Sequence, residues 1–147
     1  MDDVWAELTA PPKPGDWIRW MMRPSVFVEG PVIEWASDRA VVFDREYSRG
    51  VCVIFHQRGG RIIHLDRSRN EDVSQWVETL EQCRKAFDSI PFDARVSVMM
   101  PDGHLVVGRL GMKPDHPFYQ DIVLDSGGLH AVRADKVVEV KILQEEN

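Results

Sequence analysis

The feature that most constrains the fold of this chain is a string of residues that occurs twice. Residues 57–66 read QRGGRIIHLD, and residues 132–141 read VRADKVVEVK. Each string has an apolar or neutral residue, an arginine, a small residue, a turn-forming position, a base and two β-branched residues. This pattern is typical of a turn that leads into a strand. Its recurrence predicts one small domain written twice.

Short apolar runs of strand length surround each copy of the string. In the first half they cover residues 16–22, 25–35, 39–44, 50–56 and 61–65. In the second half they cover residues 94–100, 104–112, 121–125, 129–134 and 136–143. Turn-forming residues separate them, as expected between strands. Five short strands within about 50 residues predict a small, strongly bent barrel in each half.

The two sets of strands align residue by residue. Ile18 aligns with Val96, and Gly30 with Gly108, at an offset of 78 residues. VVFD at 41–44 aligns with IVLD at 122–125 at an offset of 81, and the string from Arg58 aligns with the string from Arg133 at an offset of 75. The offset changes only in loops, where insertions are tolerated. The alignment predicts an internal duplication.

A helical pattern lies between the two sets of strands. Apolar residues recur at helical spacing through residues 70–88, Asn70 is placed to cap the N-terminus, and Arg84 and Lys85 lie near the C-terminus. DDVWAEL at residues 2–8 looks like a short counterpart of this helix. The sequence therefore predicts a mainly β protein with one or two helices. Its domains are expected at 1–68, with the short N-terminal helix, and at 69–147, with the helix 70–88.

Composition narrows the class of protein. Of the 147 residues 44% are hydrophobic, and no apolar run approaches the roughly 18–20 residues that span a bilayer. The acidic N-terminus does not resemble a signal peptide, and Cys52 and Cys83 match no metal-binding spacing, so we expect a cytoplasmic protein with two free thiols. The net charge of −6 argues against a strong non-specific grip on nucleic acid phosphates.

The strand pattern and two motifs resemble the Sm-like (LSm) family of SH3-like small barrels. RVSVMMPDGHLVVGRLGMK followed by DIVLD resembles the first motif of that family, in which Asp-Gly precedes a bent strand with a central glycine. AVRADKVVEV resembles the second motif, and HQRGGRIIHL keeps its Arg-Gly as Arg58-Gly59. The resemblance covers about residues 16–66 and 71–143. Tudor-like or KOW-like SH3 barrels have nearly the same strand pattern.

The resemblance implies RNA binding by ring assemblies, with bases held by an arginine, an asparagine and an aromatic residue. Arg58 and Arg133 occupy the arginine place, and Phe118 or Tyr119 would offer a stacking surface. The asparagine place holds Asp121 in one half and Ala40 in the other, which departs from the family pattern. Arg58 and Arg133 have an alternative role as hairpin arginines that bridge a carboxylate. The complete predicted ligand set is Arg58, Gly59, Arg61, Tyr47, Arg133, Phe118, Tyr119 and Asp121.

Catalytic chemistry has little support in the sequence. The five histidines form no H-x-x-x-H or H-E-x-x-H pair, no glycine pair is followed by the Lys-Ser/Thr of a phosphate loop, and no serine or cysteine has the surroundings of a nucleophile elbow. The loop DHPFYQD at 115–121 groups acidic residues, a histidine and aromatic residues, and is the stretch most suited to a metal or acid–base site. A solvated loop explains it equally well. We expect no enzyme, no cofactor and no metal. Trp17, Trp20 and Trp35 exceed what one small barrel needs, and we expect them to divide between core and interface.

The sequence leaves two functions open. The first is an oligomeric tandem Sm-like protein that binds RNA or a nucleotide-type ligand, with Arg19, Arg23 and Arg49 joining Tyr47, Arg58 and Arg61 in one patch. The second is a protein-protein assembly or inhibitor module, for instance a viral accessory or structural protein. An incompletely closed barrel leaves an open edge, so we expect either self-association or a protein partner.

Overall fold

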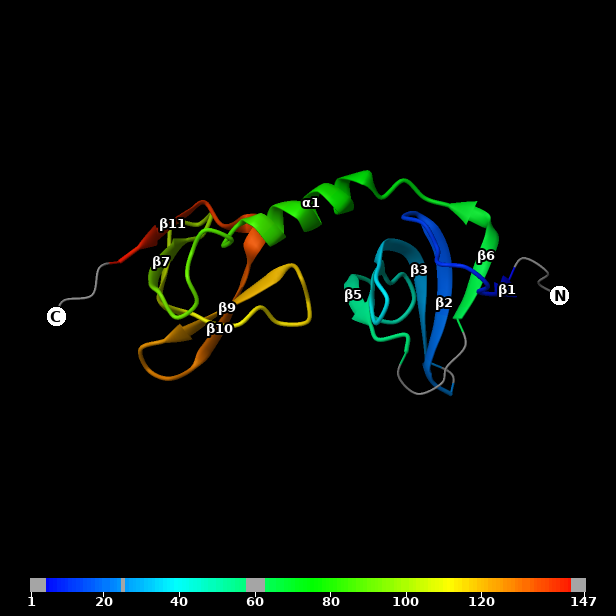
Figure 1. The fold of residues 1–147 in the computed structure, drawn as a ribbon, viewed down its shortest axis with the longest axis horizontal. Helices are drawn as coiled ribbons and strands as arrows, with labels where there is room; N and C mark the ends of the chain where they lie inside the picture. Colours follow the sequence, from blue (N-terminus) through cyan, green and yellow to red (C-terminus); the bar gives the residue numbers. More distant parts are fainter. Residues whose placement is uncertain (1–4, 25, 58–62, 144–147) are drawn as a thin grey trace. The chain divides into compact units, whose positions relative to one another are not determined.

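The computed structural model describes residues 5–24, 26–57 and 63–143, apart from the side chains at positions 22 and 23. Within these residues the protein is mainly β, with a six-stranded sheet, a five-stranded sheet and one α-helix, α1 (Ser74–Lys85) (Figure 1). All strand pairs are antiparallel. The mainly β class predicted from the sequence is confirmed.

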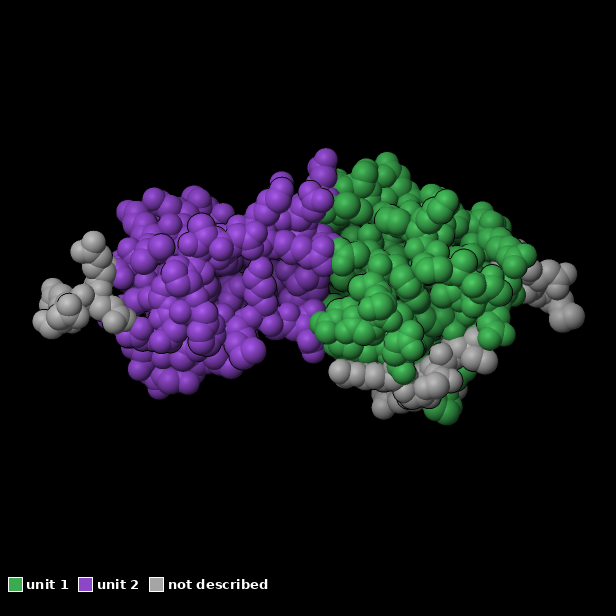
Figure 2. Space-filling view, viewed as in Figure 1, with its two compact units in different colours: residues 1–77 green, residues 78–147 purple. Residues whose placement is uncertain are grey.

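The chain divides into two compact units, residues 1–77 and residues 78–147, coloured separately in Figure 2. The division falls inside α1. Trp76 packs on Phe43 within unit 1, with ring centroids 5.2 Å apart. Leu80 and Cys83, further along the same helix, belong to unit 2 and are buried. Both ends of the helix therefore contribute apolar side chains, which explains the helical spacing in the sequence.

Unit 1 contains six strands in the order β1-β6-β2-β3-β4-β5. They are β1 (Trp5–Glu7), β2 (Asp16–Arg23), β3 (Val26–Trp35), β4 (Ala40–Phe43), β5 (Val51–Ile54) and β6 (Ile63–Asn70). Side chains that alternate along the strands turn to one face and form the core, because successive residues of a strand point to opposite faces. The buried core consists of Ile18, Trp20, Val28, Val32, Ala40, Val42, Ile54 and Ile63.

Unit 2 repeats this strand order without the first strand. Its strands are β7 (Arg95–Met99), β8 (Leu105–Leu110), β9 (Tyr119–Leu124), β10 (Leu129–Arg133) and β11 (Glu139–Ile142), and a 3-10 turn, η1 (Ala134–Lys136), precedes the last. The order β10-β9-β8-β7-β11 equals that of β5-β4-β3-β2-β6 in unit 1. The ten predicted strands are thus present and similarly connected. Among the described residues neither sheet closes into a barrel.

Two glycines hold equivalent places in the bent strands β3 and β8. Gly30 pairs with Ile18, and Gly108 pairs with Val96. A Cβ atom on Gly30 would lie 1.8 Å from the carbonyl oxygen of Phe43, and one on Gly108 would lie 2.3 Å from that of Val123. Only a residue without a side chain allows the next strand to approach so closely. The offset of 78 found in the sequence therefore has the same physical cause in both units.

The sequence alignment of β4 with β9 was wrong by one residue. Val32 pairs with Val42 in unit 1, and Leu110 pairs with Ile122 in unit 2. Val42 therefore corresponds to the buried Ile122, whereas the sequence alignment had placed it on Val123, which is exposed. A shift of one residue moves a side chain to the opposite face of a sheet, so only the strand pairing fixes this register.

The alignment of the repeated strings was also displaced. Trp20 pairs with Ile63, and Val98 pairs with Val140, so the last strands correspond at an offset of 77. In the preceding strands Ile54 pairs with Ala40, and Val132 pairs with Gln120. Arg133 therefore follows the position of Ile54 and corresponds to Phe55. The match of Arg133 with Arg58 is wrong on this register, and residue 58 itself lies outside the described part of the chain.

The predicted helix at residues 2–8 is wrong for the part that the structure describes. Residues 5–7 form β1, which pairs with β6 through Ala6 opposite Leu65 and Glu7 opposite His64. A helix of this length has too few internal hydrogen bonds to be stable, whereas the edge of β6 offers partners at once. The helix predicted at 70–88 is confirmed but shorter, since α1 covers Ser74–Lys85. The N-cap expected at Asn70 is wrong, because Asn70 ends β6 and Asp72 accepts the hydrogen bonds of Ser74.

Candidate functional site

Two groups of predicted ligand residues can be located. Tyr47 lies in unit 1, and Arg133, Phe118, Tyr119 and Asp121 lie in unit 2. Arg58, Gly59 and Arg61 lie outside the described residues, so the structure does not place them.

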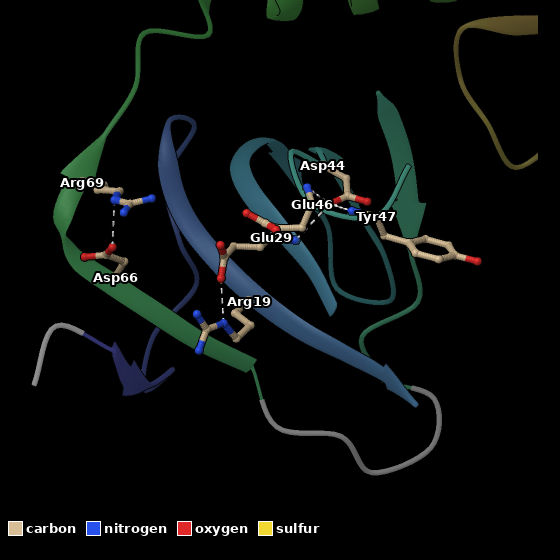
Figure 3. Close-up of polar contacts among 7 residues, drawn as sticks. All are labelled: Arg19, Glu29, Asp44, Glu46, Tyr47, Asp66 and Arg69. Carbon is tan, nitrogen blue, oxygen red and sulfur yellow. Dashed lines mark hydrogen bonds and ion pairs between the residues drawn. The ribbon is translucent and has the colours of Figure 1, made fainter. Parts of the chain in front are cut away.

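An open pocket of about 510 Å³ lies in unit 1 where β2 and β3 meet the loop after β4. It is lined by Arg19, Val26, Phe27, Glu29, Glu46 and Tyr47. Figure 3 shows Arg19 and Glu29 on neighbouring strands, with Glu46 and Tyr47 on the loop after Asp44. The pocket therefore brings together Arg19 and Tyr47, which the sequence placed in one predicted patch.

The charge of Arg19 is engaged within the fold. Its Nε donates to Oε1 of Glu29 at 2.7 Å, and the Glu29 side chain is only 12% exposed. The guanidinium carbon lies 4.2 Å from the ring centroid of Trp5 and 5.4 Å from that of Phe27. Arg19 and Glu29 are directly opposite each other in the β2–β3 register, so the strand pairing imposes this contact.

Asp44 fixes the loop that borders the pocket. Its fully buried carboxylate accepts hydrogen bonds from the backbone N–H groups of Glu29, Glu46, Tyr47 and Ser48, and from the Ser48 hydroxyl. Burial by itself acts to raise the pKa of Asp44, but the backbone hydrogen bonds outweigh it and leave the pKa below its usual value. The loop is thus held on an ionised carboxylate, which positions Glu46 and Tyr47.

The exposed side chains of this loop differ in charge and direction. Glu46 is exposed and lines the pocket. Tyr47 is 56% exposed, and its ring points away from the Arg19–Glu29 pair (Figure 3). Among the described residues that line the pocket, two are carboxylates, Glu29 and Glu46, and one is a base, Arg19. This arrangement suits a positively charged group.

Three other arginines of unit 1 are engaged in the same way as Arg19. Each pairs with a carboxylate: Arg39 with Asp38, Arg45 with Glu71 and Arg69 with the buried Asp66 (Figure 3 for the last pair). Each also lies over an aromatic ring, at 5.0, 4.7 and 4.6 Å for Phe55, Phe43 and Trp17 respectively. Each of these cations already has a carboxylate partner, which lowers its value for holding phosphates.

In unit 2 the structure brings Arg133, Phe118 and Tyr119 together. The guanidinium carbon of Arg133 lies 5.1 Å from the ring centroid of Phe118 and 5.9 Å from that of Tyr119. Its Nε and Nη2 donate to the two carboxylate oxygens of Asp135 at 2.8 and 2.9 Å, and this hydrogen bonding, before other causes, raises the pKa of Arg133. The geometry is that of a bidentate structural pair.

The aromatic residues beside Arg133 differ in access. Phe118 is 1% exposed and therefore belongs to the core of unit 2, whereas Tyr119 is half-buried. The ring of His116 meets both edge-on, with centroids 5.6 and 5.0 Å away. Asp121 is half-buried in β9, and its backbone oxygen accepts from the N–H of Gly111 at 2.9 Å. Of the two rings predicted to stack on a base, Phe118 and Tyr119, only Tyr119 has exposed surface.

The position of Arg133 has a counterpart in unit 1, where the arginine and the aromatic residue exchange places. Arg133 corresponds to Phe55, and Tyr119 corresponds to Arg39 in the register of the third strands. Arg39 lies over Phe55, and Arg133 lies over Tyr119. A cation over an aromatic ring is therefore present at the same cross-strand place in both units, with the partners swapped. This recurrence favours a stabilising role for Arg133.

The three tryptophans proposed for an interface lie at different depths. Trp20 is buried in the core of unit 1. Trp35 packs partly on that core and stacks on His56 with ring centroids 4.0 Å apart. Trp17 is half-buried beneath Arg69. None of the three forms an exposed apolar patch.

The thiols and possible metal ligands show no reactive arrangement. Burial first, and the charge of Asp44 second, raise the pKa of Cys52 to about 12, and burial raises that of Cys83 to about 11. In the described part of the chain no three or more His, Cys, Asp or Glu side chains are grouped for a metal ion. No helix of that part is long and apolar enough to cross a membrane.

Sequence reasoning missed Glu29, Glu46 and Asp44. A signal for Asp44 is present, because an aspartate before a short polar loop often accepts the hydrogen bonds of that loop. The pairing of Arg19 with Glu29 depends on strand register, which the sequence left open. Comparisons of the chain with protein-family models, with curated proteins and with solved structures found no match.

Proposed function

We propose that both units are SH3-like small barrels of the Sm-like kind and that the chain is a non-enzymatic binding protein. Support comes from the shared strand order, the glycine at the bend of each second strand and the 3-10 turn before β11. The strongly bent β3 pairs with β2 through its first half and with β4 through its second half, as in a small barrel.

The ligand that the pocket of unit 1 supports best is a basic segment of a protein partner. The observation that carries this proposal is the charge of the described residues that line the pocket, where Glu29 and Glu46 accompany one base, Arg19. Val26 and Phe27 add apolar surface for the aliphatic stem of a lysine or arginine. A carboxylate beside apolar surface is the usual setting for such side chains.

RNA binding, the first expectation from the sequence, has weaker support. Four described arginines of unit 1 are paired with carboxylates, and Arg133 is held by Asp135. RNA affinity depends on cations that are available to phosphates, and the chain carries a net charge of −6. RNA binding stays a prediction, and the experiment below decides between the two ligands.

The test is a fluorescence-anisotropy titration of the full chain with three labelled probes. The probes are a short peptide of alternating arginine and alanine, a neutral alanine-serine peptide and single-stranded polyuridylate. We expect the basic peptide to bind, with an affinity that falls as salt rises, because the contact is electrostatic. Glu46→Gln should weaken binding about twofold to fivefold, the value of one exposed ion pair.

Glu81→Gln is the matched control, because Glu81 is an exposed carboxylate on α1 and does not line the pocket. It changes the net charge equally and should leave the affinity unchanged. If polyuridylate binds and the basic peptide does not, the ligand is RNA and the protein-partner proposal is wrong. Equal losses in both variants would show a non-specific charge effect and would also reject the pocket.

A further inference from the structure

The two units differ at one edge of their sheets. In unit 1 the outer edge of β6 is covered by β1, with Ala6 opposite Leu65 and Glu7 opposite His64. In unit 2 the equivalent strand is β11, and it is the outermost strand of its sheet. No strand of the described chain pairs with its outer edge. The outer edge of β6 is therefore covered, whereas the equivalent edge of β11 has no partner strand among the described residues.

The hydrogen-bonding groups of β11 are oriented as those of β6 are. The N–H of Leu8 donates to the carbonyl of Ile63, so Ile63 and, two residues on, Leu65 direct their backbone groups towards β1. In β11 the N–H of Leu143 donates to the carbonyl of Arg95, towards β7. Backbone groups alternate in direction along a strand, so Val140 and Ile142 direct theirs away from β7, towards the outer edge of β11.

Val140 and Ile142 are the structural equivalents of Ile63 and Leu65. Leu65 pairs with Ile18 across the sheet, and Ile142 pairs with Val96, which occupies the place of Ile18 in unit 2. The same backbone groups are thus presented at the same place in both units. β1 uses them in unit 1, and they are offered at an open edge in unit 2.

Side-chain exposure shows the effect of the missing cover. Leu65 is half-buried and packs against the core of unit 1, where Leu8 joins it. Ile142, on the corresponding face of β11, is 55% exposed, and Val138 before the strand is 63% exposed. An incoming strand would remove this apolar surface from water, which favours its binding.

We propose that the outer edge of β11 binds an extended segment of a partner protein as an added antiparallel strand. The pairing of β1 with β6 supplies the chemistry of that segment. A small residue lies opposite Ile142 as Ala6 lies opposite Leu65, and an apolar residue lies opposite Val140 as Leu8 lies opposite Ile63. An acidic residue at the place of Glu7 faces Lys141, which is exposed in β11.

This surface is independent of the pocket of unit 1. It uses backbone groups and apolar side chains of residues 138–143, and none of the described residues that line the pocket takes part. The failure of one proposal therefore leaves the other intact.

The test uses a synthetic peptide with the sequence of residues 4–10, VWAELTA, added to the isotopically labelled full chain. We expect the backbone amide signals of Val140 and Ile142 to shift and their hydrogen exchange to slow. The amides of Ile63 and Leu65 should not respond, because β1 already covers them. Absence of a response in Val140 and Ile142 at saturating peptide would overturn the proposal.

Three variants make the test specific to the edge. Ile142→Pro removes an outward N–H without removing a β11–β7 hydrogen bond, and should abolish binding. Ile142→Ala keeps the N–H and should retain binding with a reduced affinity. Lys141→Glu should weaken binding about twofold to fivefold, and a peptide with lysine in place of its glutamate should restore it.

Two further outcomes would overturn the proposal. The first is a peptide response that persists in Ile142→Pro while the spectrum of unit 2 shows it folded. The second is self-association of the chain in sedimentation that Ile142→Pro abolishes, since this would assign the edge to a second copy instead of a partner protein. If Ile142→Pro does not fold, the Lys141→Glu charge exchange decides alone.

Discussion

Asp44→Asn tests whether one buried carboxylate holds the loop that borders the pocket. The substitution keeps the shape of the side chain but replaces one acceptor oxygen with an NH₂ donor. Oδ1 of Asp44 accepts three backbone N–H groups at 3.0–3.3 Å, and Oδ2 accepts the N–H and hydroxyl of Ser48 at 2.7 and 3.1 Å. An amide can satisfy only one of these two sides.

The expected loss of stability follows from this count. With its oxygen at the place of Oδ1, the amide keeps three acceptor bonds, but these are no longer charge-assisted. Its nitrogen then faces the N–H of Ser48, and a buried donor left unsatisfied costs roughly 1–3 kcal/mol. Together these effects should lower the free energy of unfolding of unit 1 by about 3 kcal/mol. That is a large part of the stability of a small domain.

The assay can be restricted to unit 1. All five tryptophans of the chain, Trp5, Trp17, Trp20, Trp35 and Trp76, lie within residues 1–77. Urea unfolding followed by tryptophan fluorescence therefore reports unit 1, and the midpoint shift multiplied by the slope gives the change in free energy. Asp38→Asn is the control, since Asp38 is an exposed carboxylate paired with Arg39, and its midpoint should not move.

The dependence on pH gives a second check. The pKa of Asp44 is lower in the folded protein than its usual value of 3.8, so its contribution is fully present above about pH 4. It disappears as the pH falls through the folded pKa, and the wild type and Asp44→Asn should then converge. A variant as stable as wild type near pH 7, or a difference that does not shrink in acid, would refute the reasoning.

Other substitutions and reactions test the remaining structural arguments. Gly30→Ala should destabilise unit 1 by more than about 3 kcal/mol, because the new Cβ would lie 1.8 Å from a carbonyl oxygen. The control Gly50→Ala, whose Cβ would meet its nearest atom at 4.0 Å, should unfold close to wild type, and similar unfolding midpoints for the two variants would contradict the close approach of β3 and β4. With pKa values of about 12 and 11, Cys52 and Cys83 should be thiolate at pH 8 in roughly one molecule in ten thousand and one in a thousand, respectively. Alkylation with iodoacetamide should therefore be slow until the protein is unfolded, and rapid labelling of the native protein would contradict this. Arg133→Ala should lower the free energy of unfolding of unit 2 by about 1–3 kcal/mol, measured by circular dichroism, because Asp135 loses its bidentate partner. Loss of RNA binding with unchanged stability would instead support a ligand role for Arg133.

The strands and the helix were accessible from sequence because their patterns are local. Alternating apolar residues marked ten strands, and the 3.6-residue spacing marked α1. The offset between Gly30 and Gly108 also survived, because a glycine at a strand bend has a steric cause that acts in both units. The short segment at residues 5–7 was misassigned, since its conformation depends on the edge of β6 and not on its own propensity.

The candidate site was less accessible, because it depends on contacts between strands. The sequence showed many arginines and tryptophans in the first half, but not that Arg19 would lie opposite Glu29, or Arg69 beside Asp66. The arginine of the repeated string gave the impression of two equivalent sites. Strand pairing places Arg133 at the position of Phe55 and pairs it with Asp135, so the apparent equivalence came from similar local composition.

By itself, the sequence determined that this protein has two similar sets of antiparallel strands with an amphipathic helix between them. These features follow from periodicity and turn residues, which act over a few residues. Tertiary structure alone decided which face each side chain takes, which arginines are neutralised and which sheet edge is left open. The physical reason is that a one-residue shift in strand register reverses every side chain, while the local pattern of the strand stays the same.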